Sequence, residues 1–367
     1  MALEIGIVGL PNAGKSTLFN ALTGAGAAVA AYPFTTIEPN VGVVPVPDPR
    51  LDRLLEIARP DRTTPATIRF VDIAGLVKGA HRGEGLGNQF LGHIRNVDAI
   101  VLVARCFTDP DIAHMAAELN PVEDIAVVQL EMALADLTTV ERRIAKVQSM
   151  RKGRPKDADL VAEEGLLRRL ADELGQSRRV SALELGEQER ALLNPLNLLT
   201  AKPVLYVANV GEGDLPGGGP LAEAVRQHSA AEGAQVVVIS ASMEADLQDW
   251  PDDEAALFRA ELGLAEAGLN AVIAAGYRLL RLITFFTVVG ENEVRAWPIP
   301  RGTVASRAAG TVHSDMERGF IRAEVVAYED LNAAGTFAAA REAGRLRLEG
   351  RDYVVQDGDV VAFRFNV

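Results

Sequence analysis

The stretch Gly9-Leu10-Pro11-Asn12-Ala13-Gly14-Lys15-Ser16-Thr17 decides the fold of this 367-residue chain. It is a complete G-x-x-x-x-G-K-S pattern between an apolar run at 3–9 (LEIGIVG) and a helix-favouring run at 16–23 (STLFNALT). Such a loop turns successive backbone N–H groups toward the phosphates of a nucleotide. Lys15 then places a cation against the β- and γ-phosphates, and Ser16 offers a hydroxyl to Mg²⁺. We therefore expect residues 12–17 to bind the phosphates, with Lys15 also taking part in catalysis.

Two further segments extend this phosphate site. Asp72-Ile73-Ala74-Gly75 follows the apolar run at 68–71, as expected for an Asp-x-x-Gly motif at the tip of a strand. There Asp72 would lie near Mg²⁺, and the Gly75 N–H would contact the γ-phosphate. Thr36, in residues 32–36 (YPFTT), can close on the metal and leave when the γ-phosphate is lost. The expected metal ligands are thus Ser16, Thr36 and Asp72, although the threonine could also be an ordinary loop residue.

Short apolar runs recur along the chain with helical patterns between them. Besides 3–9, they lie at 68–72, 99–104, 204–208 and 235–241. Strands that alternate with helices are typical of βαβ units around a parallel sheet. The fold class is therefore α/β.

The alternation stops near residue 128, and the chain is polar and helical up to about residue 200. Two apolar stripes flank a turn-like break at 151–156 (RKGRPK): Leu130, Leu137, Ile144 and Val147, and then Leu160, Leu166, Leu167, Leu170 and Leu174. We interpret residues 129–201 as two antiparallel helices inserted into a domain formed by 1–128 and 202–281. Residues 282–367, with several strand-like runs, are expected to form a small separate α+β domain.

The segment Asn209-Val210-Gly211-Glu212 stands where a GTPase carries Asn-Lys-x-Asp. In that motif the aspartate accepts hydrogen bonds from guanine N1–H and N2–H₂, which adenine lacks. Glu212 is one methylene longer, and Val210 replaces the lysine that stacks on the base. A buried polar mismatch costs about 1–3 kcal/mol, which is enough to remove the preference for guanine. Alternatively, residues 209–212 are only a loop after a strand. Residues 240–242 (SAS) fit the loop that closes on the base.

The chain resembles the Obg-like translation-factor NTPases in residues 9–23 (GLPNAGKSTLFNALT) and 32–44 (YPFTTIEPNVGVV). Asn209-x-x-Glu212 and residues 351–359 (RDYVVQDGD) are similar to the Obg-like ATPase (YchF) branch. This resemblance covers essentially the whole chain. It implies a P-loop G domain, an inserted helical coiled-coil hairpin and a C-terminal TGS domain of β-grasp type. It also implies ATP as the preferred substrate, base contacts from Asn209, Val210 and Glu212, and the ribosome as a partner.

The position that carries the water-orienting glutamine of Ras-like enzymes is Leu76, whose side chain cannot hydrogen-bond a water. Hydrolysis must therefore be slow or assisted by another residue. His81, His93 and His114 are near in sequence, and the family resemblance favours His114 as the catalytic residue. A solvated loop histidine is the alternative reading. Asn12 resembles the asparagine that coordinates K⁺ in cation-activated relatives, so K⁺ is a candidate cofactor beside Mg²⁺; alternatively, Asn12 serves the turn.

Composition narrows the partners. The formal net charge of −13 argues against general polyanion binding, yet residues 142–156 hold seven Lys or Arg and no acid. This run falls at the expected hairpin tip and predicts a surface that faces RNA, unless it is only a solvated helix face. Cys106 is the only cysteine, so no intramolecular disulfide forms. Arg278 and Arg281 interrupt the longest apolar stretch, and the first residues lack a basic signal-peptide region. We expect a cytoplasmic protein without a membrane partner.

The sequence therefore predicts an ATPase switch that acts near the ribosome. Three alternatives remain open at this point. One is a GTPase with relaxed base recognition, and another is a nucleotide-gated binding module with negligible turnover, which Leu76 would permit. A small-molecule kinase is disfavoured because no acceptor pocket or lid is evident.

Overall fold

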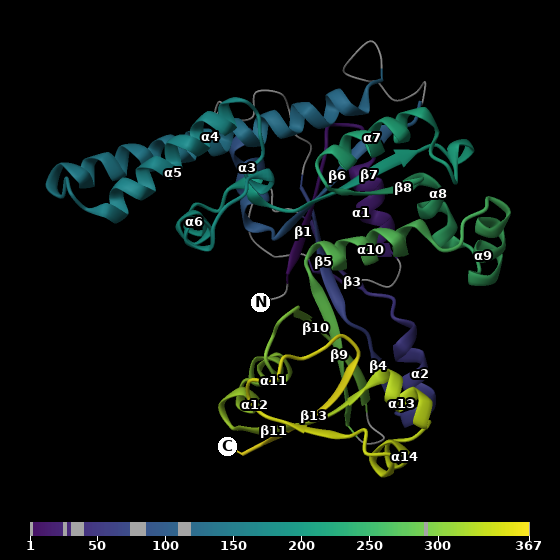
Figure 1. Ribbon diagram of the computed structural model, residues 1–367. Coiled ribbons are helices and arrows are strands. Elements are labelled where there is room, and N and C mark those ends of the chain that lie inside the picture. The colour runs from purple at the N-terminus through teal and green to yellow at the C-terminus, as the bar shows by residue number, and fades with distance from the viewer. Residues whose placement is uncertain are drawn as a thin grey trace. The chain divides into compact units, whose positions relative to one another are not determined.

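A computed structural model describes residues 3–24, 28–30, 40–73, 86–108, 119–289 and 293–366. The chain divides into two compact units. The first contains Met1–Val43 and Arg69–Gly276, and the second contains Val44–Ile68 and Tyr277–Val367. Each unit has its own β-sheet, and Figure 1 labels the elements of both.

Within the described residues, the sheet of the first unit has seven strands in the order β2-β3-β5-β1-β6-β7-β8. The pairs that join β5, β1, β6, β7 and β8 are parallel, whereas β2 and β3 are antiparallel. The bounds are β1 Glu4–Val8, β2 Ala28–Ala30, β3 Asn40–Pro45, β5 Thr67–Asp72, β6 Ala99–Cys106, β7 Val204–Val210 and β8 Gln235–Ile239. The five predicted parallel strands are therefore confirmed, and β2 and β3 extend the sheet at one edge.

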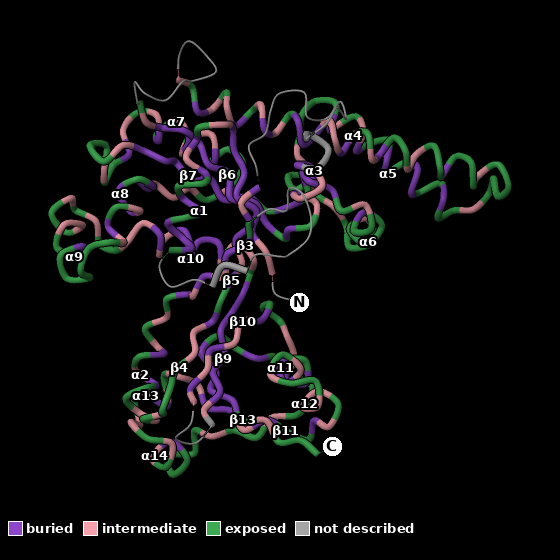
Figure 2. The backbone as a smooth tube through the Cα atoms, turned by 180° about the vertical axis from the view of Figure 1, so that it is seen from behind, coloured by how far each residue is buried: buried purple, intermediate pink, exposed green. Residues whose placement is uncertain are grey.

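Strands β6 and β7, near the centre of the sheet, contain continuous apolar runs in the sequence rather than alternations of apolar and polar residues. Every residue of β6 and β7 is buried, as the purple tube at the sheet centre shows (Figure 2). Strands covered on both faces need apolar residues on both faces. One of these faces packs against α3 (Leu86–Asn96), α4 (Pro121–Gly153) and α7 (Gly219–Ala231) in a continuous apolar core.

The remaining helices of this unit are α1, next to the P-loop, and helices that come later in the chain. Helix α1 (Lys15–Gly24) starts within the glycine-rich loop and packs on β1 and α8. The others are α5 Ala158–Gly175, α6 Glu187–Leu193, α8 Ala241–Asp246, α9 Asp252–Glu261 and α10 Gly268–Leu279. Short 3-10 turns lie at Val180–Ala182, Asn194–Leu196, Leu199–Ala201, Glu212–Asp214 and Leu247–Asp249.

Helices α4 and α5 form the predicted helical hairpin and lie side by side (Figure 1). Asn120 caps α4 and Asp157 caps α5, each through a side-chain oxygen that accepts backbone N–H groups. The first helix begins at Pro121, before the expected limit at 129, and its first turns pack on the sheet. Leu130 does not belong to the hairpin stripe, because it is 40% exposed. That part of the stripe was wrong, since the helix here faces the sheet with Ile125, Val128 and Met132.

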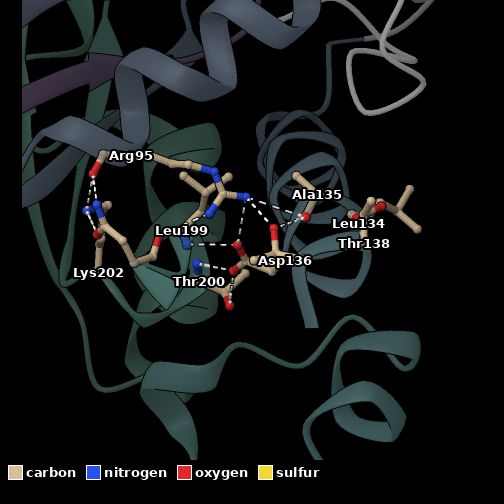
Figure 3. A network of polar contacts seen from close by, with 10 residues as sticks. Arg95, Leu134, Ala135, Asp136, Thr138, Leu199, Thr200 and Lys202 are labelled. Carbon is tan, nitrogen blue, oxygen red and sulfur yellow. Dashed lines mark hydrogen bonds and ion pairs between the residues drawn. The ribbon is translucent and has the colours of Figure 1, made fainter. Parts of the chain in front are cut away.

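A buried polar network fixes α4 to the segment before β7 (Figure 3). The fully buried Asp136 carboxylate accepts hydrogen bonds from Leu199 N (2.9 Å), Thr200 N (2.8 Å) and Thr200 Oγ1 (2.8 Å). Arg95 of α3 lies 3.6 Å from the same carboxylate, and Lys202 Nζ donates to the Arg95 carbonyl at 3.0 Å. Because a buried carboxylate must be paired or hydrogen-bonded, this network holds α3, α4 and the start of β7 in one arrangement.

The described part of the second unit has a six-stranded sheet in the order β12-β11-β13-β9-β10-β4. Its strands are β4 Arg62–Thr64, β9 Leu282–Val289, β10 Glu293–Pro300, β11 Phe320–Ala327, β12 Arg347–Glu349 and β13 Asp359–Phe365. Helix α2 (Pro49–Ala58) also belongs to this unit, through an ion pair from Arg50 to Asp357 at 2.9 Å. Residues 44–68 were expected in the phosphate-binding domain, but β4 pairs with β10 and places them here.

One face of this second sheet carries an apolar core closed by α11 (Ala305–Val312), with α12 (Ser314–Arg318) beside it. Helices α13 (Tyr328–Ala334) and α14 (Phe337–Glu342) follow β11 in the chain. Throughout the described ranges, we find no helix that combines the length and the apolar character needed to cross a bilayer.

Candidate functional site

The glycine-rich loop adopts the backbone turns that its sequence requires. Asn12 (φ 64°) and Gly14 (φ 90°) have positive φ, a conformation in which asparagine and glycine are favoured. A Cβ atom at Gly14 would clash with the Asn209 amide. A Cβ atom at Gly9 would lie 2.5 Å from the Val103 carbonyl oxygen of β6. Both glycines are therefore needed for close approach, and the loop is positioned by β6 and β7.

Lys15 is the cation of the site. Its side chain is only 7% exposed, and its Nζ donates to the Leu10 carbonyl at 2.7 Å. Burial lowers the pKa of Lys15 to about 8, and the charge of Asp72 partly offsets this effect. Leu10 is the one hydrogen-bond acceptor of this ammonium among the described residues, and an ammonium has three N–H groups with which to bind phosphate oxygens as well.

Ser16 and Asp72 come together as predicted for a metal site. Ser16 Oγ lies 3.3 Å from Asp72 Oδ2, and Asp72 Oδ1 is buried without a hydrogen-bond partner among the described residues. Burial raises the pKa of Asp72, against the opposing effects of the Ser16 hydrogen bond and the Lys15 charge. An orphaned buried carboxylate oxygen beside a hydroxyl fits an oxygen-coordinated divalent cation. Among the described residues, no three His, Cys, Asp or Glu side chains come close enough together to bind a metal ion. A P-loop Mg²⁺ does not require such a group, because phosphates and water supply most of its ligands.

Asn209 connects the two loops that border the site. Its side chain is 4% exposed, its Nδ2 donates to the Ala13 carbonyl at 3.0 Å, and its Oδ1 accepts from Ala241 N at 3.0 Å. One end of the amide thus holds the phosphate loop, and the other holds the loop after β8. The geometry gives Asn209 a positioning role for backbone groups that surround a ligand.

A cavity of about 490 Å³ opens above this loop at the carboxyl ends of the parallel strands. Ligands of open α/β sheets bind at this edge. Its lining contains Asn12, Gly14, Lys15, Ser16, Thr17, Phe107, Thr108, Asn209, Val210, Gly211 and Ser242. Most of these residues were predicted as nucleotide-binding residues, and the sequence also indicated the loop of Ser242. Ala13 is buried and contributes its carbonyl to the Asn209 contact.

Phe107 and Thr108 were missed by the motif search. They directly follow β6, and their place after a buried strand next to β1 was the signal that could have found them. The Arg105 guanidinium lies 4.9 Å from the centre of the Phe107 ring and limits its orientation. The cavity wall therefore includes an aromatic face.

The two positions that distinguish this chain from a GTPase, Val210 and Glu212, differ in burial. The Val210 side chain is buried in the apolar core, so only its backbone is left to face a base. Glu212 is exposed, begins the turn Glu212–Asp214 and does not line the cavity. His93 lies half-buried on α3 and does not line the cavity either. The other predicted residues, Thr36, Gly75, Leu76, His81 and His114, lie outside the described residues.

Comparison with known proteins accounts for the full chain. The family described as "50S ribosome-binding GTPase" matches residues 4–142, and a YchF-GTPase C-terminal family, described as "protein of unknown function (DUF933)", matches residues 282–366. The ribosome-binding ATPase YchF of Bacillus subtilis (strain 168) is 52% identical over 369 residues, with 100% of both chains covered. The chain belongs to the YchF family. Its Escherichia coli O157:H7 relative is also 52% identical, over 367 residues and 100% of both chains.

A solved structure agrees with this membership. The Schizosaccharomyces pombe YchF GTPase has a TM-score of 0.88 and 35% sequence identity, and the match covers 99% of this chain and 97% of that one. This similarity confirms the α/β class, the P-loop sheet, the inserted hairpin and the C-terminal β domain of the YchF fold. The bacterial relatives are named ATPases and the yeast protein a GTPase, so the names differ on the base that is used.

Proposed function

We propose that this chain is an ATPase that binds the ribosome and changes its association with it according to the bound nucleotide. The observation that carries this proposal is full-length identity of 52% with two ribosome-binding ATPases, in a chain whose phosphate loop and cavity are complete. We also propose a cytoplasmic location, because a protein that binds ribosomes must be in the compartment that holds them. The direct test measures ATP hydrolysis by the purified protein with and without ribosomes. We expect ribosomes to increase the rate. No hydrolysis under either condition would reject the proposal that the protein is an ATPase.

The residues of the loop perform separate parts of this function. Backbone N–H groups of the loop and the Lys15 ammonium bind the β- and γ-phosphates, and Ser16 with Asp72 would hold Mg²⁺. Mg²⁺ supplies charge neutralisation at the β- and γ-phosphate oxygens when bound. Thr36 and Gly75 are proposed as further contacts to the metal and to the γ-phosphate. Asp72→Ala should reduce the difference between ATP affinities measured in Mg²⁺ and in EDTA, whereas an unchanged difference would contradict the assignment.

ATP rather than GTP is the proposed substrate. Glu212 is exposed and Val210 is buried in the core, so neither side chain reproduces the guanine contacts of Asn-Lys-x-Asp. Among the described residues that line the cavity, including Phe107 and Gly211, none carries a carboxylate. Competition binding should show ATP preferred by about tenfold or more, which corresponds to about 1.4 kcal/mol. Equal displacement by GTP would favour the GTPase with relaxed base recognition.

His114 is the proposed catalytic residue, on the family resemblance and on the replacement of the water-orienting glutamine by Leu76. His114→Ala should abolish most turnover while ATP affinity is unchanged. His93→Ala and His81→Ala are the matched controls, because both are nearby histidines with no proposed role. Single-turnover kinetics would separate slow chemistry from a binding module with negligible turnover. Full activity of the His114 variant would overturn the assignment.

K⁺ is a further proposed cofactor through Asn12. Its left-handed backbone conformation (φ 64°) also suits an asparagine that serves only the turn. Hydrolysis rates in KCl and in NaCl at equal ionic strength distinguish the two roles. A higher rate in KCl is expected, because a cation beside the phosphates stabilises developing charge. Equal rates would show that Asn12 serves only the backbone turn.

The hairpin tip is the proposed ribosomal RNA contact. Arg143 and Arg151 of the basic run 142–156 are bound to Glu163 and Glu164 of α5. The other basic residues of the run are exposed: Arg142, Lys146, Lys152, Arg154 and Lys156. Their charges therefore face solvent at the end of the hairpin, where a phosphate backbone can approach.

Ribosome co-sedimentation tests this contact. Glutamine at Lys152, Arg154 and Lys156 should weaken binding and make it less sensitive to salt, because each lost phosphate contact removes about one unit from the salt slope. The matched control replaces three hairpin arginines that are paired with glutamates: Arg168, Arg169 and Arg178. Identical binding by the tip variant and the wild type would refute the RNA contact without affecting the ATPase proposal.

A further inference from the structure

The second unit contains a cavity of about 610 Å³ that the nucleotide chemistry does not use. It is larger than the nucleotide cavity described above and lies within the size range of small-molecule sites. Strands β9, β11 and β13 form its floor, and the end of α2 and one side of α14 form its walls. All of its lining residues belong to the second unit, so it is a feature of this unit alone.

The strand register shows that the floor is the sheet face opposite the apolar core. Val326 of β11 pairs with Val360 of β13, which pairs with Phe286 of β9. Two residues earlier in β11, Glu324 pairs with Ala362 of β13 and with Leu348 of β12. These positions alternate with the core residues of the same strands, as side chains do across a sheet. The floor is apolar except for Glu324, and Leu348 beside it is 63% exposed.

Helix α14 gives the cavity one apolar end and one charged end. Phe337 and Ala338 line it at the start of the helix, and Arg341 and Glu342 line it one turn later. Residues four apart lie on the same side of a helix, so the four side chains form two parallel rows along the wall. A ligand that fits must have an apolar body and a charged head.

The charges at that end determine which head group fits. Glu324 is neutralised by Arg364, which donates to both of its oxygens at 3.0 and 3.2 Å. Within the described ranges, the side chains of Arg341 and Glu342 form no hydrogen bond or ion pair, and the Arg341 charge acts on Glu324 only through space. The cavity therefore presents one guanidinium that can bind a carboxylate and one carboxylate that can bind an ammonium.

We propose that this cavity binds a small apolar zwitterion, namely an apolar amino acid or a short apolar peptide with free ends. Its carboxylate contacts Arg341, its ammonium contacts Glu342, and its apolar side chains cover the valines of the floor and Phe337. Both charged residues are exposed, so the apolar body supplies most of the affinity and binding is expected in the millimolar to high-micromolar range.

Calorimetric titration of the full-length protein with L-leucyl-L-phenylalanine tests the proposal. Saturable binding with one site is expected. The N-acetyl dipeptide lacks the ammonium and the dipeptide amide lacks the carboxylate, so each should bind about fivefold more weakly. Equal affinity for all three probes would overturn the head-group assignment. The lack of saturable binding by any of them would overturn the proposal.

Variants locate the site. Arg341→Gln should weaken the free dipeptide about fivefold and leave its affinity for the amide unchanged, because the amide has no carboxylate. Arg345→Gln is the matched control: it removes the same charge four residues away, and Arg345 does not line the cavity. Ala338→Phe fills the apolar end and should abolish binding. An unchanged circular-dichroism spectrum and an unchanged urea unfolding curve show that each variant is folded, and tight dipeptide binding by Ala338→Phe would contradict this location.

Discussion

Lys15 and Asn209 show how two buried side chains prepare the site for phosphate. Lys15 supplies charge, and its burial gives it a pKa of about 8. Asn209 supplies no charge, and both ends of its amide are occupied by backbone groups of Ala13 and Ala241. We propose that Lys15 contacts the phosphates directly, whereas Asn209 holds the two loops that border the cavity.

The affinity for ATP should fall as the pH rises through about 8, the pKa of Lys15 in the protein by itself. Bound phosphates favour the ammonium and raise this pKa, so binding above pH 8 requires uptake of a proton. The dissociation constant is expected to increase about tenfold between pH 7.5 and pH 9. Titration calorimetry in two buffers of different ionisation enthalpy would detect the proton. Lys15→Arg stays charged in this range and should lose the dependence; a flat wild-type profile would contradict the role of the low pKa.

Asn209→Ala should weaken ATP, ADP and GTP by similar factors. The change leaves the Ala13 carbonyl and the Ala241 N–H without their partner, at about 1–3 kcal/mol for each buried group. Part of this loss will appear as lower affinity, about ten- to a hundredfold, since 1.4 kcal/mol is tenfold. Competition binding with the three nucleotides measures it. A change in the preference between ATP and GTP would instead assign Asn209 to base recognition.

At the level of elements, the hairpin is joined by a regular seam with charged residues in it. Its α4 side contains Ala133, Leu137, Val140, Ile144 and Val147, in alternating steps of four and three residues. This is the spacing of a coiled coil. Glu163 of α5 is buried at the seam and pairs with Arg143 at 2.6 Å. Hydrogen bonds from Arg168, Arg151 and Gln148 lower the pKa of the neighbouring Glu164 to about 2.

The Arg143–Glu163 pair should serve the geometry of the hairpin more than its stability. Arg143→Ala leaves Glu163 buried without its partner and should destabilise the protein by about 2 kcal/mol, less than a fully buried pair because Arg143 is partly exposed. The double variant with Arg143→Met and Glu163→Leu should regain most of this loss, since well-packed apolar residues replace buried pairs without penalty. Urea unfolding of both variants measures the difference. A double variant no more stable than Arg143→Ala would show that the pair itself stabilises the hairpin.

At the level of the whole molecule, the second unit is assembled from two separate parts of the chain. Residues 44–68 contribute α2 and β4, and their partners come from beyond residue 276. Arg50 shows this dependence, because it pairs with Asp357 and lies 5.3 Å from the centre of the Phe286 ring. The two ends of the inserted part meet, since Val46 N donates to the Ala66 carbonyl at 2.8 Å.

A chain that ends at Gly276 should therefore aggregate, because β4 loses its partner strand and α2 loses its contacts. If a short Gly/Ser linker also replaces residues 44–68 and joins Val43 to Arg69, the first unit should be soluble and bind ATP. Size-exclusion chromatography and nucleotide binding compare the two chains. Equal solubility of both would show that residues 44–68 do not need the C-terminal part.

The sequence by itself determined the phosphate loop, the five parallel strands and the hairpin. These are local or strictly periodic signals: a glycine-rich turn between strand and helix, continuous apolar runs and helical spacing. It also placed Lys15, Ser16 and Asp72 in one site, because parallel strands carry their loops to the same edge.

Only the tertiary structure decided the rest. Leu130 lies outside the seam because α4 first packs on the sheet, and residues 44–68 leave the first unit because β4 pairs with a strand more than two hundred residues away in sequence. Asn209 acquires its positioning role from two backbone groups that no spacing rule connects. Each of these outcomes depends on which surfaces meet after folding, and a linear pattern of apolar and polar residues holds no information on that choice.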